Sequence, residues 1–159
     1  MNTAARWFCM LLAVCGLSAC GAGDSLGEAG TTPQSVESAS SQEGTSLKIT
    51  VGKEELMATW EDNSSAREFQ ELLEQGPVTI EMEDYGGFEK VGTLGTDLTR
   101  NDRQITTEPG DVILYQGNQI TIYYGTNTWN FTRLAKIDDP ADLQAKLGEG
   151  RVQVTFSLG

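Results

Sequence analysis

The side chains able to do chemistry are few in this chain, and their types restrict the possible reactions. The 159 residues contain no histidine, which excludes Ser-His-Asp and Cys-His nucleophilic sites, histidine-bound zinc and an imidazole base. The three cysteines are Cys9, Cys15 and Cys20. Because all of them precede the segment that we expect to fold, that segment is predicted to have neither a disulfide nor thiol chemistry.

Carboxylates are the next candidates, because paired carboxylates can act as general acid and base. Glu81, Glu83 and Asp84 lie close together, as do Asp138 and Asp139. However, Glu81 and Glu83 alternate with apolar residues, as expected for the solvent-exposed face of a strand. Asp138 and Asp139 are typical of the start of a helix. The sequence also has no Asp-x-Asp-x-Asp-Gly calcium loop. We therefore expect no metal site and no cofactor.

Aromatic residues near a glycine-rich turn are better candidates for binding. Segment 84–92 contains a Gly-Gly pair and presents four side chains together: Tyr85, Phe88, Glu89 and Lys90. One interpretation is the rim of a groove that receives a peptide or a small ligand. The alternative is that Tyr85 and Phe88 close one end of a barrel and that Glu89 and Lys90 form a surface pair.

Three further aromatic residues are predicted to supply the floor of such a groove, with ordinary packing as the alternative for each. They are Tyr115, Tyr123 and Trp129. The full set of candidate ligand-binding residues is Tyr85, Phe88, Lys90, Tyr115, Tyr123 and Trp129.

Two arginines stand apart from other cations. Arg67 lies on the flank of a predicted helix and is expected in a salt bridge. Arg133 lies between short predicted strands that are rich in aromatic residues, and it is the one catalytic candidate, since a guanidinium can polarise a bound carbonyl. Isomerising a prolyl bond needs little more than an apolar pocket and one such donor, because polarisation and desolvation lower the barrier of ~20 kcal/mol.

Alternating apolar residues predict the elements that position these side chains. Strands are expected over 47–51, 54–60, 78–83, 112–115, 120–124, 128–131, 132–137 and 152–158. A helix should start at Asp62-Asn63 and end before Gly76-Pro77, and a second should run from Ala141 to Leu147 behind Asp139 and Pro140. Short strands without a long βαβ rhythm favour a mainly β fold, a closed eight-stranded antiparallel barrel with two short helices.

The N-terminal part of the sequence indicates where the protein is localised. Residues 1–19 have a charge at Arg6 followed by a short apolar run, as in a signal peptide. Residues 20–46 are rich in Gly, Ser, Thr and acids and are predicted to be a flexible tether to a domain over 47–159. With a net charge of −12, the chain is expected to be a poor nucleic-acid binder.

The tetrapeptide Leu17-Ser18-Ala19-Cys20 resembles the bacterial lipobox. This resemblance implies cleavage before Cys20, acylation of its thiol, and a lipoprotein anchored to a bacterial membrane with its domain on the extracytoplasmic side of the cell envelope. The alternative is an ordinary secretory signal with a chance cysteine.

Several ordered motifs indicate a family. They are Asp84-Tyr85-Gly86-Gly87-x-Glu89-Lys90, then Gly110-Asp111-Val112-x-Leu114-Tyr115, then Ile120-x-Ile122-x-Tyr124-Gly125. Together they resemble the bacterial cyclophilin-like domain family over roughly residues 47–156. The resemblance implies a closed eight-stranded barrel with a helix at each end.

The resemblance does not carry an activity with it. Eukaryotic-type cyclophilins use an arginine in a Phe-His-Arg type segment and a nearby Gln-Gly-Gly stretch, and this sequence contains neither. We therefore expect a non-catalytic module that binds a peptide, a protein or a small ligand. The alternatives are a prolyl isomerase acting on exported proteins and an assembly accessory without a ligand groove.

Overall fold

The computed structural model describes residues 45–159. The predicted signal peptide, Cys20 and all but the last two residues of the tether lie outside this range. Nine strands and two helices follow one another as β1 (Leu47–Val51), β2 (Glu54–Trp60), α1 (Ser64–Glu74), β3 (Val78–Tyr85), β4 (Glu89–Thr93), β5 (Arg103–Thr106), β6 (Asp111–Tyr115), β7 (Gln119–Tyr123), β8 (Thr128–Ile137), α2 (Leu143–Leu147) and β9 (Val152–Leu158). Within this range no helix is both long and apolar enough to cross a membrane.

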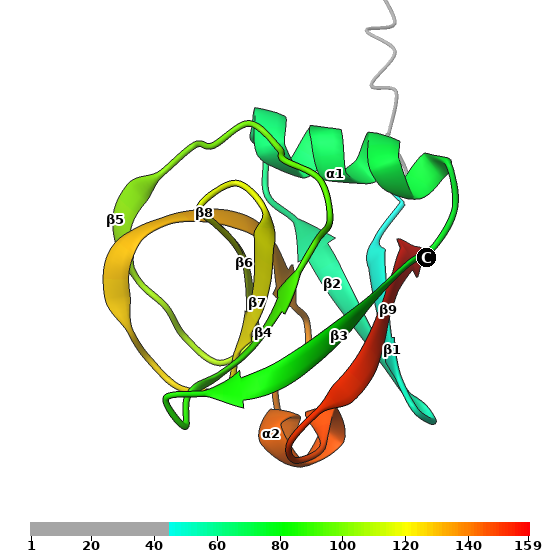
Figure 1. The fold of residues 1–159 in the computed structure, drawn as a ribbon, viewed down its shortest axis with the longest axis vertical. Coiled ribbons are helices and arrows are strands. Elements are labelled where there is room, and N and C mark those ends of the chain that lie inside the picture. Colours follow the sequence, from blue (N-terminus) through cyan, green and yellow to red (C-terminus); the bar gives the residue numbers. More distant parts are fainter. Residues whose placement is uncertain (1–44) are drawn as a thin grey trace, which may run out of the picture. The chain divides into compact units, whose positions relative to one another are not determined.

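Eight of the strands close into a barrel (Figure 1). Their order is β2-β1-β9-β3-β4-β7-β6-β8, and β2 pairs with β8 to complete the ring. Every pairing is antiparallel. The predicted closed eight-stranded antiparallel barrel with two short helices is therefore confirmed.

Strand β5 lies outside the ring of eight, and its pairing with β8 explains part of the difference between the predicted and the observed strands. Segments 128–131 and 132–137 were expected as two strands, but β8 is continuous, and its first half pairs with β5 while its second half pairs with β6. Strands β4 and β5 were not predicted. Their sequences, EKVGT and RQIT, are mostly polar and carry no clear alternation, so their pairing partners rather than their own composition make them strands.

The barrel core is apolar, and a helix covers each end (Figure 1). Helix α1 buries Ala66, Phe69 and Leu73, and the Phe69 ring centroid lies 5.8 Å from that of Phe156 on β9. As predicted, the helix begins behind Asn63, whose Oδ1 accepts a hydrogen bond from Ala66 N at 2.9 Å.

The start of α2 differs from the prediction. The helix begins at Leu143 rather than at Ala141. Asp139 does act locally, since its Oδ1 accepts a hydrogen bond from Ala141 N at 3.1 Å, but Asp142 adopts a positive φ of 53°. A residue in this left-handed conformation interrupts a right-handed helix, so the turn after Pro140 is not continuous with α2.

Candidate functional site

A pocket of about 480 Å³ opens on the outer face of the barrel wall. Strand alternation creates this face, because successive side chains of a strand point to opposite sides. On β7, Ile120 and Ile122 belong to the barrel core, whereas Thr121 and Tyr123 line the pocket. The pocket is therefore separated from the core by the wall itself.

Neighbouring strands continue this outer face in register. Glu89 on β4 pairs with Tyr123 on β7, and Val91 pairs with Thr121. On the other side of β4, Tyr85 on β3 pairs with Glu89. Tyr85, Glu89 and Tyr123 thus form one row across three strands, and all three line the pocket.

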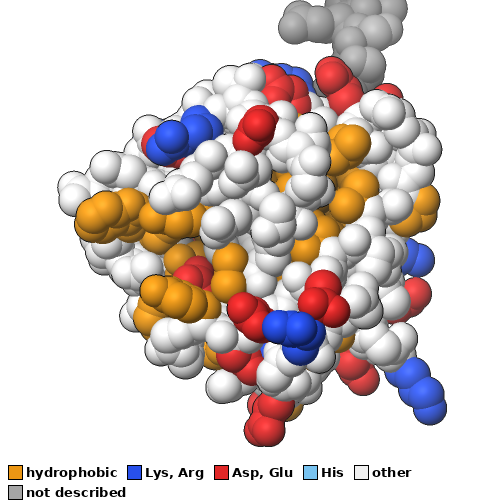
Figure 2. Space-filling model, in the orientation of Figure 1, with side chains coloured by type: hydrophobic (Ala, Val, Ile, Leu, Met, Phe, Trp, Pro, Cys, Tyr) orange, Lys and Arg blue, Asp and Glu red, His pale blue; other side chains and the backbone are white. Residues whose placement is uncertain are grey.

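Aromatic rings form much of the pocket wall. Phe131, at the start of β8, lies with its ring centroid 5.7 Å from that of Tyr123 and 6.0 Å from that of Tyr115. Tyr85 and Trp129 stand at the surface, with 62% and 59% of their area exposed. Figure 2 shows hydrophobic side chains gathered over the side of the molecule where β5 and β8 lie in Figure 1. A ligand in the pocket would therefore meet aromatic faces.

Two buried polar atoms at the pocket have no partner within residues 45–159. They are Glu89 Oε2 and Thr121 Oγ1. Glu89 is only 7% exposed and Thr121 only 2%. Native structures rarely leave such atoms without a hydrogen bond, so each needs an explanation. A polar group of a bound ligand, or water, would satisfy both.

Glu89 is the single charged residue among those that line the pocket. Burial raises the pKa of its carboxyl above the ordinary value, and the neighbouring Tyr123 hydroxyl partly offsets this effect. The same burial, together with Glu89, raises the pKa of Tyr123 as well. The pocket therefore combines one desolvated carboxyl group with aromatic walls.

The predicted binding residues divide into three groups. Tyr85, Tyr115, Tyr123 and Trp129 line the pocket. Phe88 supports it from the side, because its ring stacks on that of Tyr123 at a centroid distance of 6.1 Å and an interplanar angle of 8°. Lys90 is separated from these residues by the barrel wall.

Lys90 points into the barrel and is fully buried. Its register partner on β7 is the core residue Ile122. Its Nζ lies 2.8 Å from Asp84 Oδ1 and donates a hydrogen bond to the Gly150 carbonyl oxygen at 2.6 Å. These partners stabilise the charged side chain in a position where an unpaired ammonium would be very costly.

Sequence reasoning missed Glu89 and Thr121 as pocket residues. Glu89 was placed in the segment predicted to form the rim of a groove, with a surface pair with Lys90 as the alternative, but it was not named among the candidate ligand-binding residues. The residues of β7 that face outward are Thr121 and Tyr123, and this alternation can be seen in the sequence. It identifies Glu89 as a neighbour of Tyr123 only once β4 is known to pair with β7.

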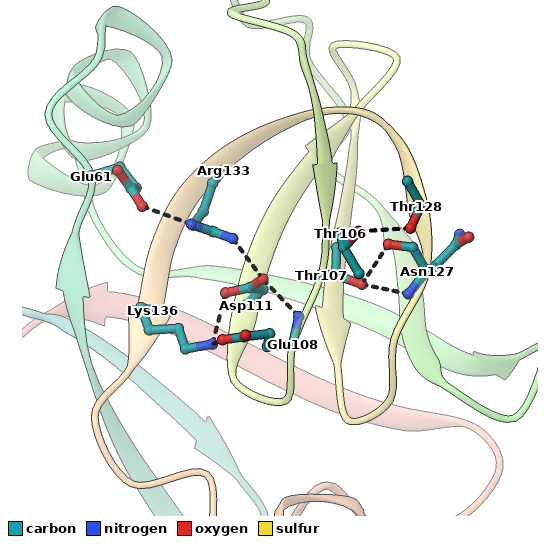
Figure 3. A network of polar contacts seen from close by, with 9 residues as sticks. All are labelled: Glu61, Thr106, Thr107, Glu108, Asp111, Asn127, Thr128, Arg133 and Lys136. Carbon is teal, nitrogen blue, oxygen red and sulfur yellow. Dashed lines mark hydrogen bonds and ion pairs between the residues drawn. The ribbon is translucent and has the colours of Figure 1, made fainter.

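Arg133, the catalytic candidate, lies outside the lining of this pocket. Figure 3 shows its guanidinium between Glu61 and Asp111, with Nη1 3.4 Å from Glu61 Oε1 and Nη2 3.0 Å from Asp111 Oδ2. Asp111 is fully buried and also pairs with Lys136 Nζ at 3.0 Å. The network joins β6 to the second half of β8 beside the bulge in their pairing. These contacts indicate a structural role for Arg133.

A second set of contacts in Figure 3 holds the pocket's edge. Thr107 N donates to the Asn127 carbonyl oxygen at 2.8 Å, and Asn127 N donates to Thr107 Oγ1 at 2.9 Å. Thr106 and Thr128 join their hydroxyls at 2.8 Å. Because Asn127 lines the pocket, these bonds fix the edge that β5 and β8 contribute.

The other candidate charges have surface roles. Glu81 and Glu83 both pair with Arg151, at 3.4 Å and 3.2 Å. Arg67 pairs with Asp62 at 2.7 Å, as expected of a residue on the helix flank. Solvent-exposed pairs of this kind contribute little stability.

The fold and the site together define a small antiparallel barrel domain with an aromatic, singly charged pocket on its outer wall. The sequence model of the cyclophilin-like family matches residues 49–157, and the chain belongs to this family. A comparison with curated proteins finds no match.

Proposed function

We propose that this protein is a non-catalytic binding module whose outer-wall pocket receives a small ligand or a side chain of a peptide or protein. The pocket itself supports this proposal. Its volume of about 480 Å³ falls within the range of small-molecule sites, which are mostly apolar with a few placed polar groups. The unpartnered Glu89 Oε2 and Thr121 Oγ1 are such groups.

A fragment screen by NMR on the full-length protein tests this proposal. The screen includes neutral, cationic and anionic fragments, and those that bind should shift the amide signals of Val91, Thr121 and Phe131. Thr121→Phe fills the pocket and should abolish the shifts, whereas Thr50→Phe on β1, outside the pocket lining, should preserve them. If no fragment perturbs these signals, or if Thr121→Phe binds as well as the unmodified protein, the proposed binding site is wrong.

A prolyl isomerase has less support from the geometry. The arginine that would polarise a prolyl carbonyl, Arg133, is engaged by Asp111 and Glu61 and is separate from the aromatic pocket. A protease-coupled assay with an Ala-Pro peptide measures this activity directly. We expect the uncatalysed rate for the full-length protein and for Arg133→Ala, and a faster rate that Arg133→Ala abolishes would establish the enzyme.

We also propose that the protein is a lipoprotein held on a bacterial membrane through Cys20, with the domain on the extracytoplasmic side of the cell envelope. The support is the Leu17-Ser18-Ala19-Cys20 sequence after a short apolar run and the stability of a doubly acylated anchor. Cys20→Ser should move the protein from the membrane fraction to the soluble fraction. Ala19→Ser keeps the cysteine and serves as the control, and unchanged membrane association of Cys20→Ser would contradict the anchor.

A further inference from the structure

We propose that the outer-wall pocket is specific for an organic cation, an ammonium group seated between the aromatic rings and the Glu89 carboxylate. This inference deepens the proposed binding function and rests on it. The ammonium can belong to a free amine or to a lysine-type side chain of a peptide, since the recognising chemistry is the same.

The charge of the pocket is the first argument. Glu89 is the single charged residue in the lining, and among the ion pairs of residues 45–159 it has no cationic partner. Lys90, its neighbour in sequence, points into the barrel and is paired with Asp84. A buried carboxylate without a counter-ion is costly, and a bound cation is the group that removes this cost.

The aromatic rings are the second argument. Five of the eleven lining residues are aromatic: Tyr85, Tyr115, Tyr123, Trp129 and Phe131. Their negative ring faces attract an ammonium electrostatically, and the effect is greatest with Trp and in desolvated sites. Trp129 and Tyr85 are the most exposed of the five, so they stand where a ligand enters, whereas Tyr123 and Phe131 are buried.

The remaining polar groups fit the same ligand. Thr121 Oγ1 is buried without a partner, and Gln116, Gln119 and Asn127 line the pocket with side chains that can accept hydrogen bonds. No lysine or arginine is among the lining residues, so a carboxylate or phosphate ligand would meet Glu89 without any compensating charge. An anion is therefore the least favoured occupant.

Two probes that differ only in charge test the inference on the unmodified full-length protein. The probes are choline and its neutral isostere, in which carbon replaces the quaternary nitrogen. We expect choline to shift the NMR signals of Val91, Thr121 and Phe131, and the isostere to bind at least about tenfold more weakly. Equal or tighter binding of the isostere would overturn the cation preference while leaving the proposed binding function intact.

Glu89→Gln then tests the role of the carboxylate. The substitution preserves the shape of the side chain, and it should weaken choline binding by about tenfold while leaving the isostere unaffected. Glu74→Gln removes the same charge from an exposed position on α1 and should change neither affinity. Unchanged choline binding in Glu89→Gln would show that the Glu89 carboxylate does not contact the cation. If this variant does not fold, the comparison of choline with its neutral isostere on the unmodified protein still tests the cation preference.

A third probe separates the two sources of the ammonium. A short peptide carrying trimethyl-lysine should bind more tightly than choline if the natural ligand is a peptide, and no more tightly if it is a free amine. Either result supports the cation site. If neither choline nor the peptide binds while neutral fragments do, the inference fails alone; if nothing binds in the pocket, the proposed function fails with it.

Discussion

Glu89 and Lys90 follow one another on β4, and their side chains lie on opposite sides of the barrel wall. Glu89 lines the outer pocket beside Tyr123, whereas Lys90 points into the barrel, is fully buried and pairs with the partly exposed Asp84 at 2.8 Å. The wall therefore separates a carboxylate from the ammonium next to it in sequence. This separation leaves Glu89 without a cationic partner among residues 45–159 and makes Lys90 part of the core.

Lys90→Ala should strongly destabilise the fold. The substitution leaves a cavity and removes the partner of Asp84 and of the Gly150 carbonyl oxygen. Breaking a fully buried pair costs about 3–5 kcal/mol, but the side chain of Asp84 is 33% exposed. Asp84 retains hydrogen bonds from the Tyr124 hydroxyl and from Gly150 N, which places the expected loss at the lower end of that range. Urea unfolding measures it.

Lys90→Met is the matched control for this prediction, since it fills the same space without the charge. We expect it to be more stable than Lys90→Ala. A loss of less than about 1 kcal/mol for Lys90→Ala would show that the buried pair contributes little.

Glu89→Gln should stabilise the ligand-free protein at neutral pH. Burial raises the pKa of Glu89 in the fold, so the folded state holds its proton more tightly than the unfolded chain, and stability falls as pH rises through the interval above the ordinary value of 4.5. Glutamine has no proton to lose, so the variant does not show this loss of stability. The groups that face Glu89 from β3 and β7 are Tyr85 and Tyr123, and neither is charged at neutral pH.

The free energy of unfolding, measured against pH, checks the sign. The advantage of Glu89→Gln over the unmodified protein should be greatest at neutral pH, shrink as pH falls towards 4.5 and be absent below that pH. Glu74→Gln, at an exposed position, should show no such trend. An advantage that grows on acidification would contradict the raised pKa.

Asp111→Ala should cost about 3 kcal/mol, because it leaves Arg133 and Lys136 without their shared buried partner. It also removes the acceptor of the hydrogen bond from Glu108 N at 2.9 Å. Thermal and denaturant unfolding measure the loss. Asp97→Ala, on an exposed position, should stay within about 0.5 kcal/mol of the unmodified protein, and an equal effect of both substitutions would reject the network's structural role.

Asn63→Ala should destabilise the protein by about 1–2 kcal/mol, the usual cost of losing an N-cap. Asn63 also donates a hydrogen bond from Nδ2 to the Arg133 carbonyl oxygen at 2.8 Å, which ties α1 to β8. Asn63→Asp keeps the cap acceptor and loses this donor, so its loss of stability should be smaller. Circular dichroism during urea unfolding distinguishes the two variants, and an equal loss would show that the cap itself contributes nothing.

Local patterns were sufficient for much of the barrel. The sequence predicted the alternation in β9, where Val154 and Phe156 are buried. It also predicted the start of α1 behind Asn63. Both features depend on neighbouring residues alone. Four of the six predicted binding residues line one pocket because aromatic residues on the outer face of strands have few other places to pack. The continuity of β8 could not be predicted, since its two halves pair with different strands.

The amino-acid sequence by itself determined the class of fold, the absence of histidine chemistry and the supply of aromatic residues. Only the tertiary structure decided which side of the wall each residue of β4 faces, and therefore that Glu89 lies in the pocket while Lys90 lies in the core. The physical reason is that β4 is too polar to reveal its inner face, so its orientation is set by its register with β3 and β7.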